Sequence, residues 1–295
     1  MQISPRRYMD ATTDFGFKKL FGQEESKPVL KGFLYELLDL PAPIAELTFL
    51  STEQLPRTAE ERRGIFDIYC VDENGQRFIV EMQKAQQYYF RDRALYYSTF
   101  PIVNQVERGE DWNYQLNPVY CVGILNFIFE DDDRFLHRVR LIDETTHKVF
   151  SDKLTFVYVE LPKFNLGLEE LETFRDKWIY FLKHVTQFRE IPETFSEVPF
   201  DLAFHLAELA QLTDEEAAYY EGSLKQSRDR YAENETAHLQ GKEEGITEGR
   251  ELGLKQRSIE IAQTLIRQQM PLSTILQITG LTEEEVQPLL GENQN

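Results

Sequence analysis

The feature that most constrains this chain is the dipeptide Asn74-Gly75, which lies between two short runs rich in apolar and β-branched residues. Asn-Gly flanked by such runs is a strong signal of a β-hairpin. The sequence therefore predicts two antiparallel strands, one on each side of residues 72–75. If the hairpin is centred on Asn74, Asp67 pairs with Glu81, because each lies seven residues from the centre. A slip of one residue would change this pairing.

The predicted pairing brings two carboxylates together. Residues directly opposite each other in an antiparallel pair have Cβ atoms about 4.5–5.5 Å apart, and like charges at that distance destabilise a sheet. A cation between Asp67 and Glu81 would remove the repulsion, and hard oxygen ligands of this kind suit Mg²⁺ or Mn²⁺. Two plain alternatives remain: each carboxylate faces solvent, or Arg77 or Lys84 separates them. Gln83 shares the face of Glu81, because side chains alternate along a strand.

The rest of the first 220 residues alternates between helical and strand patterns. Such alternation favours an α/β fold with a central sheet. The two Cys and five His show no ligand spacing, and we interpret them as structural or exposed, while Asp14 is interpreted as a cap or loop residue. The patterns predict helices at 28–40, 87–108, 168–189 and 200–220, and strands at 44–51, 64–72, 76–84, 118–129, 135–143 and 153–161.

Composition excludes several classes of protein. The hydrophobic content of 41% is enough for a buried core, so wholesale disorder is excluded. The net charge of −19, from 32 basic and 51 acidic residues, argues against a protein that coats nucleic acid by bulk charge. No apolar run reaches the roughly 18 residues that a membrane span needs. The N-terminus has no apolar signal region. We therefore expect a cytoplasmic protein with no membrane partner.

The last third of the chain has a different composition. From about residue 224 it is polar, with glycines at 241, 245, 249 and 253 that would lie along one face of a helix. Such a helix is either a solvated spacer or a surface that a second backbone can approach closely. We favour a linker or oligomerising helix over disorder.

The end of the chain contains two short apolar helical patterns that resemble a helix-turn-helix. The last of these helices begins with three glutamates, Glu283 to Glu285, which counts against reading of DNA bases. A small packing or oligomerisation element is preferred. The sequence thus predicts a main domain at 1–222, a Gly-spaced helical linker at 223–256 and a small helical element at 257–295.

A group of short motifs together resembles one family, the Rpn-type recombination-promoting nucleases, which are also described as transposases of the PD-(D/E)XK nuclease superfamily. The resemblance spans residues 10 to about 190 and the Gly-spaced tail. The motifs are Asp14–Phe21 (DFGFKKLF), Phe66–Ile68, Glu81–Gln83, Arg93–Tyr97 and Glu160–Phe164. The resemblance implies a restriction-endonuclease-like α/β core, in which a mixed central sheet is flanked by helices, with a helical C-terminal extension.

The resemblance also implies roles for individual residues. Asp67 and Glu81 match the metal-ligating carboxylates, and the backbone carbonyl of Met82 is the implied third ligand. Gln83 stands where the superfamily usually has a lysine, so it can orient a water molecule but supplies no charge. Glu36, or Asp39 one turn away, matches an accessory acid that some members have.

The missing positive charge has two candidate sources, Lys18 and Arg93. The implied activity is Mg²⁺- or Mn²⁺-dependent hydrolysis of phosphodiester bonds in DNA by a homo-oligomer, connected with recombination, mobile elements or defence. Two other hypotheses remain open. One is a non-catalytic scaffold that assembles through its tail, and the other is a DNA-binding regulator that acts through residues 257–290. A titration of the protein with divalent metal discriminates the nuclease from the scaffold.

Overall fold

The computed structural model describes residues 6–54, 64–86, 88–105 and 113–291. The chain divides into two compact units, Met1–Arg228 and Asp229–Asn295. Each unit is described by itself. The three-part division at residues 222 and 256 stays a prediction, and one continuous helix passes through both of those positions.

The first unit is built on a six-stranded mixed sheet with the order β1-β4-β5-β6-β8-β7. The first three strands in this order are antiparallel, β5, β6 and β8 are parallel, and β7 returns antiparallel to β8. The mixed central sheet of a restriction-endonuclease-like core is therefore confirmed. The strands are β1 (Leu47–Phe49), β4 (Ile68–Asp72), β5 (Arg77–Gln83), β6 (Val119–Leu125), β7 (Leu136–Ile142) and β8 (Val149–Glu160), and a separate pair is formed by β2 (Glu53–Gln54) and β3 (Gly64–Ile65).

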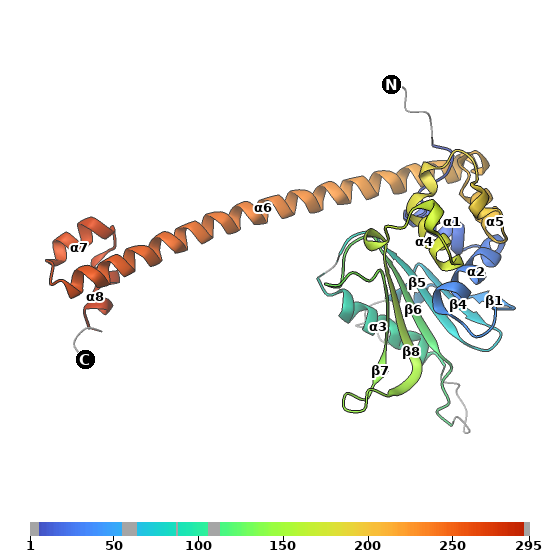
Figure 1. The fold of residues 1–295 in the computed structure, drawn as a ribbon, viewed down its shortest axis with the longest axis horizontal. Coiled ribbons are helices and arrows are strands. Elements are labelled where there is room, and N and C mark those ends of the chain that lie inside the picture. Colours follow the sequence, from blue (N-terminus) through green and yellow to red (C-terminus); the bar gives the residue numbers. More distant parts are fainter. Residues whose placement is uncertain (1–5, 55–63, 87, 106–112, 292–295) are drawn as a thin grey trace. The chain divides into compact units, whose positions relative to one another are not determined.

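Helices cover both faces of this sheet (Figure 1). One face and the main core lie against four helices, α1 (Asp14–Phe21), α2 (Lys27–Leu38), α4 (Phe174–His184) and α5 (Phe200–Ala207). The other face packs against α3 (Phe90–Val103). Short 3-10 turns lie at Glu24–Ser26, Leu161–Lys163, Leu168–Glu170, Val185–Gln187, Glu193–Phe195 and Leu209–Gln211.

The hairpin between β4 and β5 forms at the predicted turn. Asp72 Oδ1 accepts hydrogen bonds from the backbone N–H groups of Asn74 (3.0 Å) and Gln76 (2.7 Å), as turn aspartates do. Gly75 has φ = +77°, and a Cβ there would lie 2.5 Å from Asn117 Nδ2. The turn thus needs glycine for its backbone conformation and for the neighbour that packs on it.

Several expected elements differ from those observed. The predicted strand 64–72 is interrupted at Phe66 and Asp67, and its first part pairs with β2 instead of with β5. The predicted helix 168–189 begins only at Phe174, because Thr173 caps it by accepting from Asp176 N. The predicted helix 200–220 is two helices separated by residues 208–213, and the second, α6 (Asp214–Arg267), continues through the Gly-spaced tail.

The helix α1 was not predicted at all. Thr13 is its N-cap, and the Thr13 side chain accepts a hydrogen bond from Gly16 N at 3.0 Å. Phe17, Leu20 and Phe21 are its buried face. Asp14 is therefore the first residue of a helix and does not lie in a loop.

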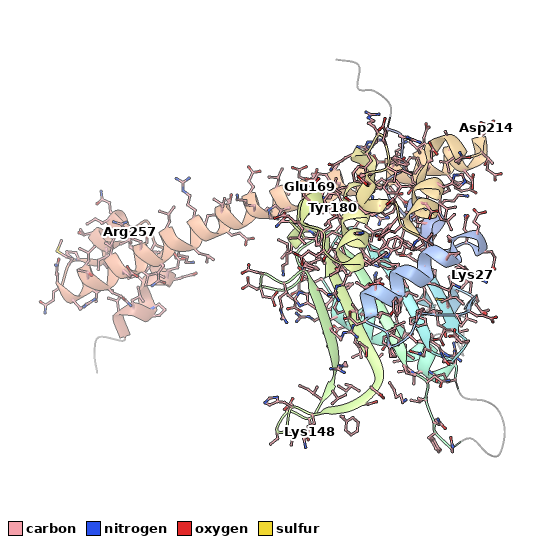
Figure 2. All side chains as sticks on the ribbon, turned by 45° about the vertical axis from the view of Figure 1, so that its right-hand side comes forward. Lys27, Lys148, Glu169, Tyr180, Asp214 and Arg257 are labelled. Atoms are coloured by element: carbon pink, nitrogen blue, oxygen red, sulfur yellow. The ribbon has the colours of Figure 1, made fainter. Side chains whose placement is uncertain are left out.

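The β7–β8 hairpin extends beyond the end of β6, since β6 begins to pair with β8 only at Leu154. Figure 2 shows Lys148 at the tip of this extension. Among the described residues, no helix is both long and apolar enough to cross a membrane.

The second unit contains three helical segments: the end of α6, α7 (Leu272–Thr279) and α8 (Glu283–Gly291). Its small core is formed by Ala262, Ile275, Leu281 and Val286. Gly280, with φ = +70°, ends α7 in the left-handed conformation that helix C-termini favour.

Candidate active site

The two carboxylates lie at the end of the hairpin, and the predicted register is confirmed. Ile68 pairs with Val80 and Tyr69 with Ile79, so the next position places Asp67 opposite Glu81. The local geometry differs from the expected regular strand, because the chain bends at Asp67.

The bend has a packing cause. Phe66 and Tyr69 both belong to the cluster on the α3 face, although residues three apart in a regular strand point to opposite faces. The Phe66 ring contacts the rings of Tyr69 and Tyr97, with centroids 5.5 Å apart in each case. Burial of Phe66 under α3 therefore interrupts the strand directly before β4, at Asp67.

The Asp67 carboxylate accepts a hydrogen bond from a backbone N–H group of β5, as a carbonyl of a neighbouring strand would. Its Oδ2 accepts a hydrogen bond from Met82 N at 2.8 Å. The N–H and C=O groups of one strand residue point to the same edge of the strand, so the Met82 carbonyl also points toward the side of Asp67. Burial raises the pKa of Asp67, and the hydrogen bond from Met82 opposes this shift.

Glu81 is the more strongly perturbed of the two acids. Its side chain is 16% exposed, and it lies on the face that packs against α3. Burial first, and the charge of Asp67 second, raise the pKa of Glu81 to about 8. The buried Oε1 atom of Glu81 has no hydrogen-bond partner. A buried carboxylate oxygen without a partner is costly, and a bound cation is one of the groups that would satisfy it.

Gln83 lies beside Glu81, as expected from alternation. Its Nε2 donates to Glu81 Oε2 at 2.8 Å. Lys84 lies on the other face, where its Nζ contacts Ser227 Oγ of α6 at 2.9 Å, so it does not replace the missing lysine. Arg93 of α3 approaches the acids instead, with Nη2 3.9 Å from Glu81 Oε2.

The helix α1 supplies the second positive charge. Lys18 lowers the pKa of Asp67 by its charge, and Asp14 raises it, although both effects are smaller than that of burial. Lys18 Nζ and Asp14 Oδ1 form an ion pair at 2.8 Å. The sequence reasoning missed Asp14 as a site residue. The capping pattern of Thr13 followed by an amphipathic run was the signal that could have revealed this helix.

Glu36 is acted on by charged groups other than those that act on Asp67. Its charged neighbours are Asp39, which together with burial raises the pKa of Glu36, and Arg175, which lowers it. Asp39 itself forms ion pairs with Arg175 (3.1 Å) and Arg138 (3.5 Å). Glu36 thus shares a charge cluster with Asp39 and Arg175, its accessory role stays a prediction, and Asp14 is a helix acid whose charge acts on Asp67.

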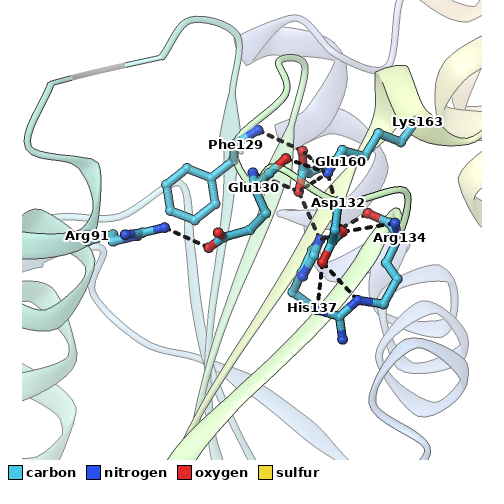
Figure 3. Close-up of polar contacts among 8 residues, drawn as sticks. All are labelled: Arg91, Phe129, Glu130, Asp132, Arg134, His137, Glu160 and Lys163. Atoms are coloured by element: carbon cyan, nitrogen blue, oxygen red, sulfur yellow. Dashed lines mark hydrogen bonds and ion pairs between the residues drawn. The ribbon is translucent and has the colours of Figure 1, made fainter.

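A second polar cluster lies at the same end of the parallel strands as Gln83 (Figure 3). The Glu160 carboxylate is fully buried, and it accepts hydrogen bonds from Phe129 N (2.6 Å) and Glu130 N (3.3 Å). Lys163 Nζ lies 3.1 Å and His137 Nε2 lies 2.9 Å from its oxygens. This cluster therefore anchors the segment that connects β6 to β7.

The anchored segment begins next to the candidate site. Gln83 is level with Leu125 on β6, and Leu125 is level with Glu160 on β8. Asn126 N donates to the Gln83 carbonyl at 2.9 Å. We therefore interpret Glu160 and its partners as a support for the carboxyl ends of the parallel strands, where Gln83 lies.

The donor set fits a hard divalent cation. Two carboxylates and a backbone carbonyl, with one carboxylate oxygen unpaired, are the kind of ligands that Mg²⁺ accepts alongside water and phosphate oxygens. Over the described ranges 6–54, 64–86, 88–105 and 113–291, the candidate site included, no three His, Cys, Asp or Glu side chains form a group that could hold a metal ion, so the side-chain ligands available here are the two carboxylates alone.

Comparison with known families agrees with this geometry. The family described as PD-(D/E)XK nuclease family transposase matches residues 11–237. The chain belongs to this family. The Rpn/YhgA-like nuclease family, C-terminal HTH domain, matches residues 255–291. No curated protein and no solved structure matches the chain.

The two family matches together cover the main domain and the C-terminal tail. PD-(D/E)XK nucleases generally use divalent metals. The second family match covers the end of α6 together with α7 and α8, so these segments are similar to that C-terminal helix-turn-helix domain. The helix α8 still begins with Glu283, Glu284 and Glu285, and Glu285 is paired with Lys255 at 2.6 Å.

Proposed function

We propose that this chain is a Mg²⁺- or Mn²⁺-dependent DNA endonuclease whose metal is held by Asp67, Glu81 and the Met82 carbonyl. The observation that carries the proposal is the Asp67–Glu81 pair, in which a buried carboxylate oxygen of Glu81 has no partner. Burial first and the charge of Asp67 second raise the pKa of Glu81 to about 8, and a strongly perturbed carboxyl of this kind is typical of functional sites.

Each nearby side chain has a role in the proposal. A divalent ion held there would lower the pKa of a water molecule and offset negative charge on the scissile phosphate. Gln83, whose amide donates to Glu81 Oε2, would orient the attacking water beside the metal ligands. Arg93 and Lys18 supply the positive charge that a lysine at position 83 supplies in other PD-(D/E)XK nucleases.

The partner of the site is DNA, and a recombination, mobile-element or defence role in the cytoplasm is part of the same proposal. The C-terminal helix-turn-helix domain supports nucleic-acid binding, although its glutamate-rich last helix is unsuited to base reading. Self-association through the Gly-spaced part of α6 would bring two sites to one duplex. Light scattering of the full chain at micromolar concentration tests this, and a monomer would contradict it.

The test of the proposal is the conversion of supercoiled plasmid to nicked and linear forms. Wild-type protein is expected to cut with Mg²⁺ or Mn²⁺ and not with EDTA. Asp67→Asn and Glu81→Gln are expected to remove cutting without loss of folding, and calorimetry is expected to show that they no longer bind metal. Glu172→Gln, a change at an exposed glutamate, is the matched control. Wild-type protein that binds no metal and cuts no DNA would favour the scaffold hypothesis.

A further inference from the structure

A groove of about 630 Å³ lies between α1 and the first turns of α6. The helix α1 contributes Asp14, Phe15 and Lys18 to its lining, and α6 contributes Tyr219 and Gly222. All of these residues belong to the first unit. Figure 2 labels Asp214, where α6 begins. A groove of this volume is large enough for a small molecule or one unit of a polymer.

Two residues of α1 link the groove to the candidate active site. Asp14 and Lys18 line it, and they are also the α1 residues whose charges act on Asp67. A molecule in the groove therefore lies against an ion pair whose charges act on Asp67. This shared ion pair is the observation that relates the groove to the DNA strand proposed to be cut.

The walls of the groove are held by specific contacts. Lys19 of α1 forms an ion pair with Glu216 of α6 at 2.8 Å. The Tyr220 hydroxyl accepts a hydrogen bond from Asp10 N at 2.8 Å, and Ser227 Oγ lies 2.9 Å from Lys84 Nζ of the segment after β5. The start of α6 is therefore fixed against both α1 and the strand that carries Glu81.

The lining suits a flat, uncharged ring with a phosphate at one end. Tyr219 is 68% exposed, so its ring is available to a ligand, and Phe15 lies on the opposite helix. A Cβ at Gly222 would meet no atom within 4 Å, so the space at this position is open. Among the charged lining residues, Asp14 and Glu215 balance Lys18 and Lys19, and a groove without net charge is unsuited to a long stretch of phosphates.

We propose that this groove takes one unstacked nucleotide of the DNA strand that is cut, with its base against Tyr219 and its phosphate toward Lys18. The inference rests on the proposed nuclease function and adds a preference to it. A base in the groove must leave the duplex stack, which costs least in single-stranded, mismatched or damaged DNA. The protein therefore cuts such DNA faster than a fully paired duplex.

Two pairs of variants test the groove. Gly222→Leu fills it, and Ala232→Leu introduces the same side chain at an exposed position of the same helix, outside the four glycines at 241, 245, 249 and 253. Tyr219→Ala removes the ring, and Tyr219→Phe keeps it. The probe is a fluorescent single-stranded oligodeoxynucleotide of mixed sequence, and binding is measured in EDTA and again in Mg²⁺.

Stacking of one base contributes a factor of about 10 or more to the affinity for single strands. Gly222→Leu and Tyr219→Ala are expected to lose this factor, and Ala232→Leu and Tyr219→Phe are expected to bind as the wild type does. An oligonucleotide with 5-iodouracil is expected to crosslink to Tyr219. Unchanged binding by Gly222→Leu and Tyr219→Ala, or no binding by the wild type in either condition, overturns the inference.

Nicking assays separate this inference from the proposed function. A wild-type protein that nicks mismatched plasmid and paired plasmid equally fast, with no effect of Gly222→Leu, retains the nuclease function and loses the groove. A wild-type protein that binds single strands through Tyr219 but cuts no DNA in Mg²⁺ retains the groove and loses the nuclease function.

Discussion

The Glu81 carboxyl makes the stability of the metal-free protein depend on pH. The pKa of Glu81 is raised from 4.5 to about 8 in the folded state, first by burial and second by Asp67. Between these two values the folded chain holds a proton that the unfolded chain has released. Stability therefore falls as pH rises through this window.

The magnitude follows from the linkage relation. Each pH unit inside the window costs about 1.4 kcal/mol, so a rise from pH 5.5 to 7.5 costs about 3 kcal/mol. For a unit of this size, that loss lowers the melting temperature by roughly 6–12 °C. The pKa of Asp67 is also raised, so this carboxyl likewise costs stability as pH rises above its ordinary pKa of 3.8.

The variant that isolates this effect is Glu81→Gln, which keeps the shape of the side chain and removes its titration. Thermal melts in EDTA across pH 5–8 are the measurement. We expect the variant to match the wild type near pH 5 and to exceed its melting temperature near pH 7.5. Glu172→Gln, at an exposed position, is expected to keep the wild-type slope. Identical pH slopes for the wild type and Glu81→Gln would refute the reasoning.

Metal should reverse the trend. An ion that binds the ionised pair stabilises the folded state by about 2.7 kcal/mol at 100 times its Kd, and its affinity rises with pH because the proton on Glu81 must leave. We expect Mg²⁺ to raise the melting temperature more at pH 8 than at pH 6. The same rise in Glu81→Gln would show that the ion binds elsewhere.

Three further predictions concern the support of the site and the tail. Gln83→Ala is expected to lower the cutting rate by roughly 10²–10⁴ at unchanged metal affinity, whereas Gln83→Lys is expected to retain cutting; an inactive, folded Lys variant would show that the site requires a neutral side chain. Glu160→Gln leaves Lys163 without its buried partner and is expected to cost about 3–5 kcal/mol in denaturant unfolding, and a loss below 1 kcal/mol would contradict the anchoring role. A chain that ends at residue 228 is expected to fold and bind metal. Light scattering is expected to show fewer chains per particle than for the full chain, and double-strand cutting is expected to weaken more than nicking of one strand. The same number of chains per particle in both proteins would contradict the predicted assembly.

Local chemistry made the hairpin predictable. Asn74-Gly75 supplies the turn, Gly75 adopts the positive φ that this turn requires, and the register of Asp67 with Glu81 follows by counting. Alternation then correctly placed Gln83 beside Glu81 and Lys84 on the opposite face. These features depend on residues near one another in the chain, so the sequence contains all the information that they need.

Features that depend on distant parts of the chain were not predictable in this way. The interruption of the strand at Asp67 depends on Phe66 packing under α3, which is formed by residues about 30 positions later. The approach of Asp14 and Lys18 depends on α1 being placed against the sheet. The resemblance implied an accessory role for Glu36, but which charges act on this residue, Asp39 and Arg175, depends on how its helix packs.

The sequence by itself determined the hairpin, its register and the pair of acids, because turn chemistry and the two-residue period of a strand act over a few residues. Only the tertiary structure decided how the acids are used. Burial under α3 raised the pKa of Glu81, the bend turned Asp67 toward Met82 N, and the packing of α1 against the start of α6 made the groove beside them. Desolvation and long-range charge depend on where the whole chain folds, and no local pattern encodes them.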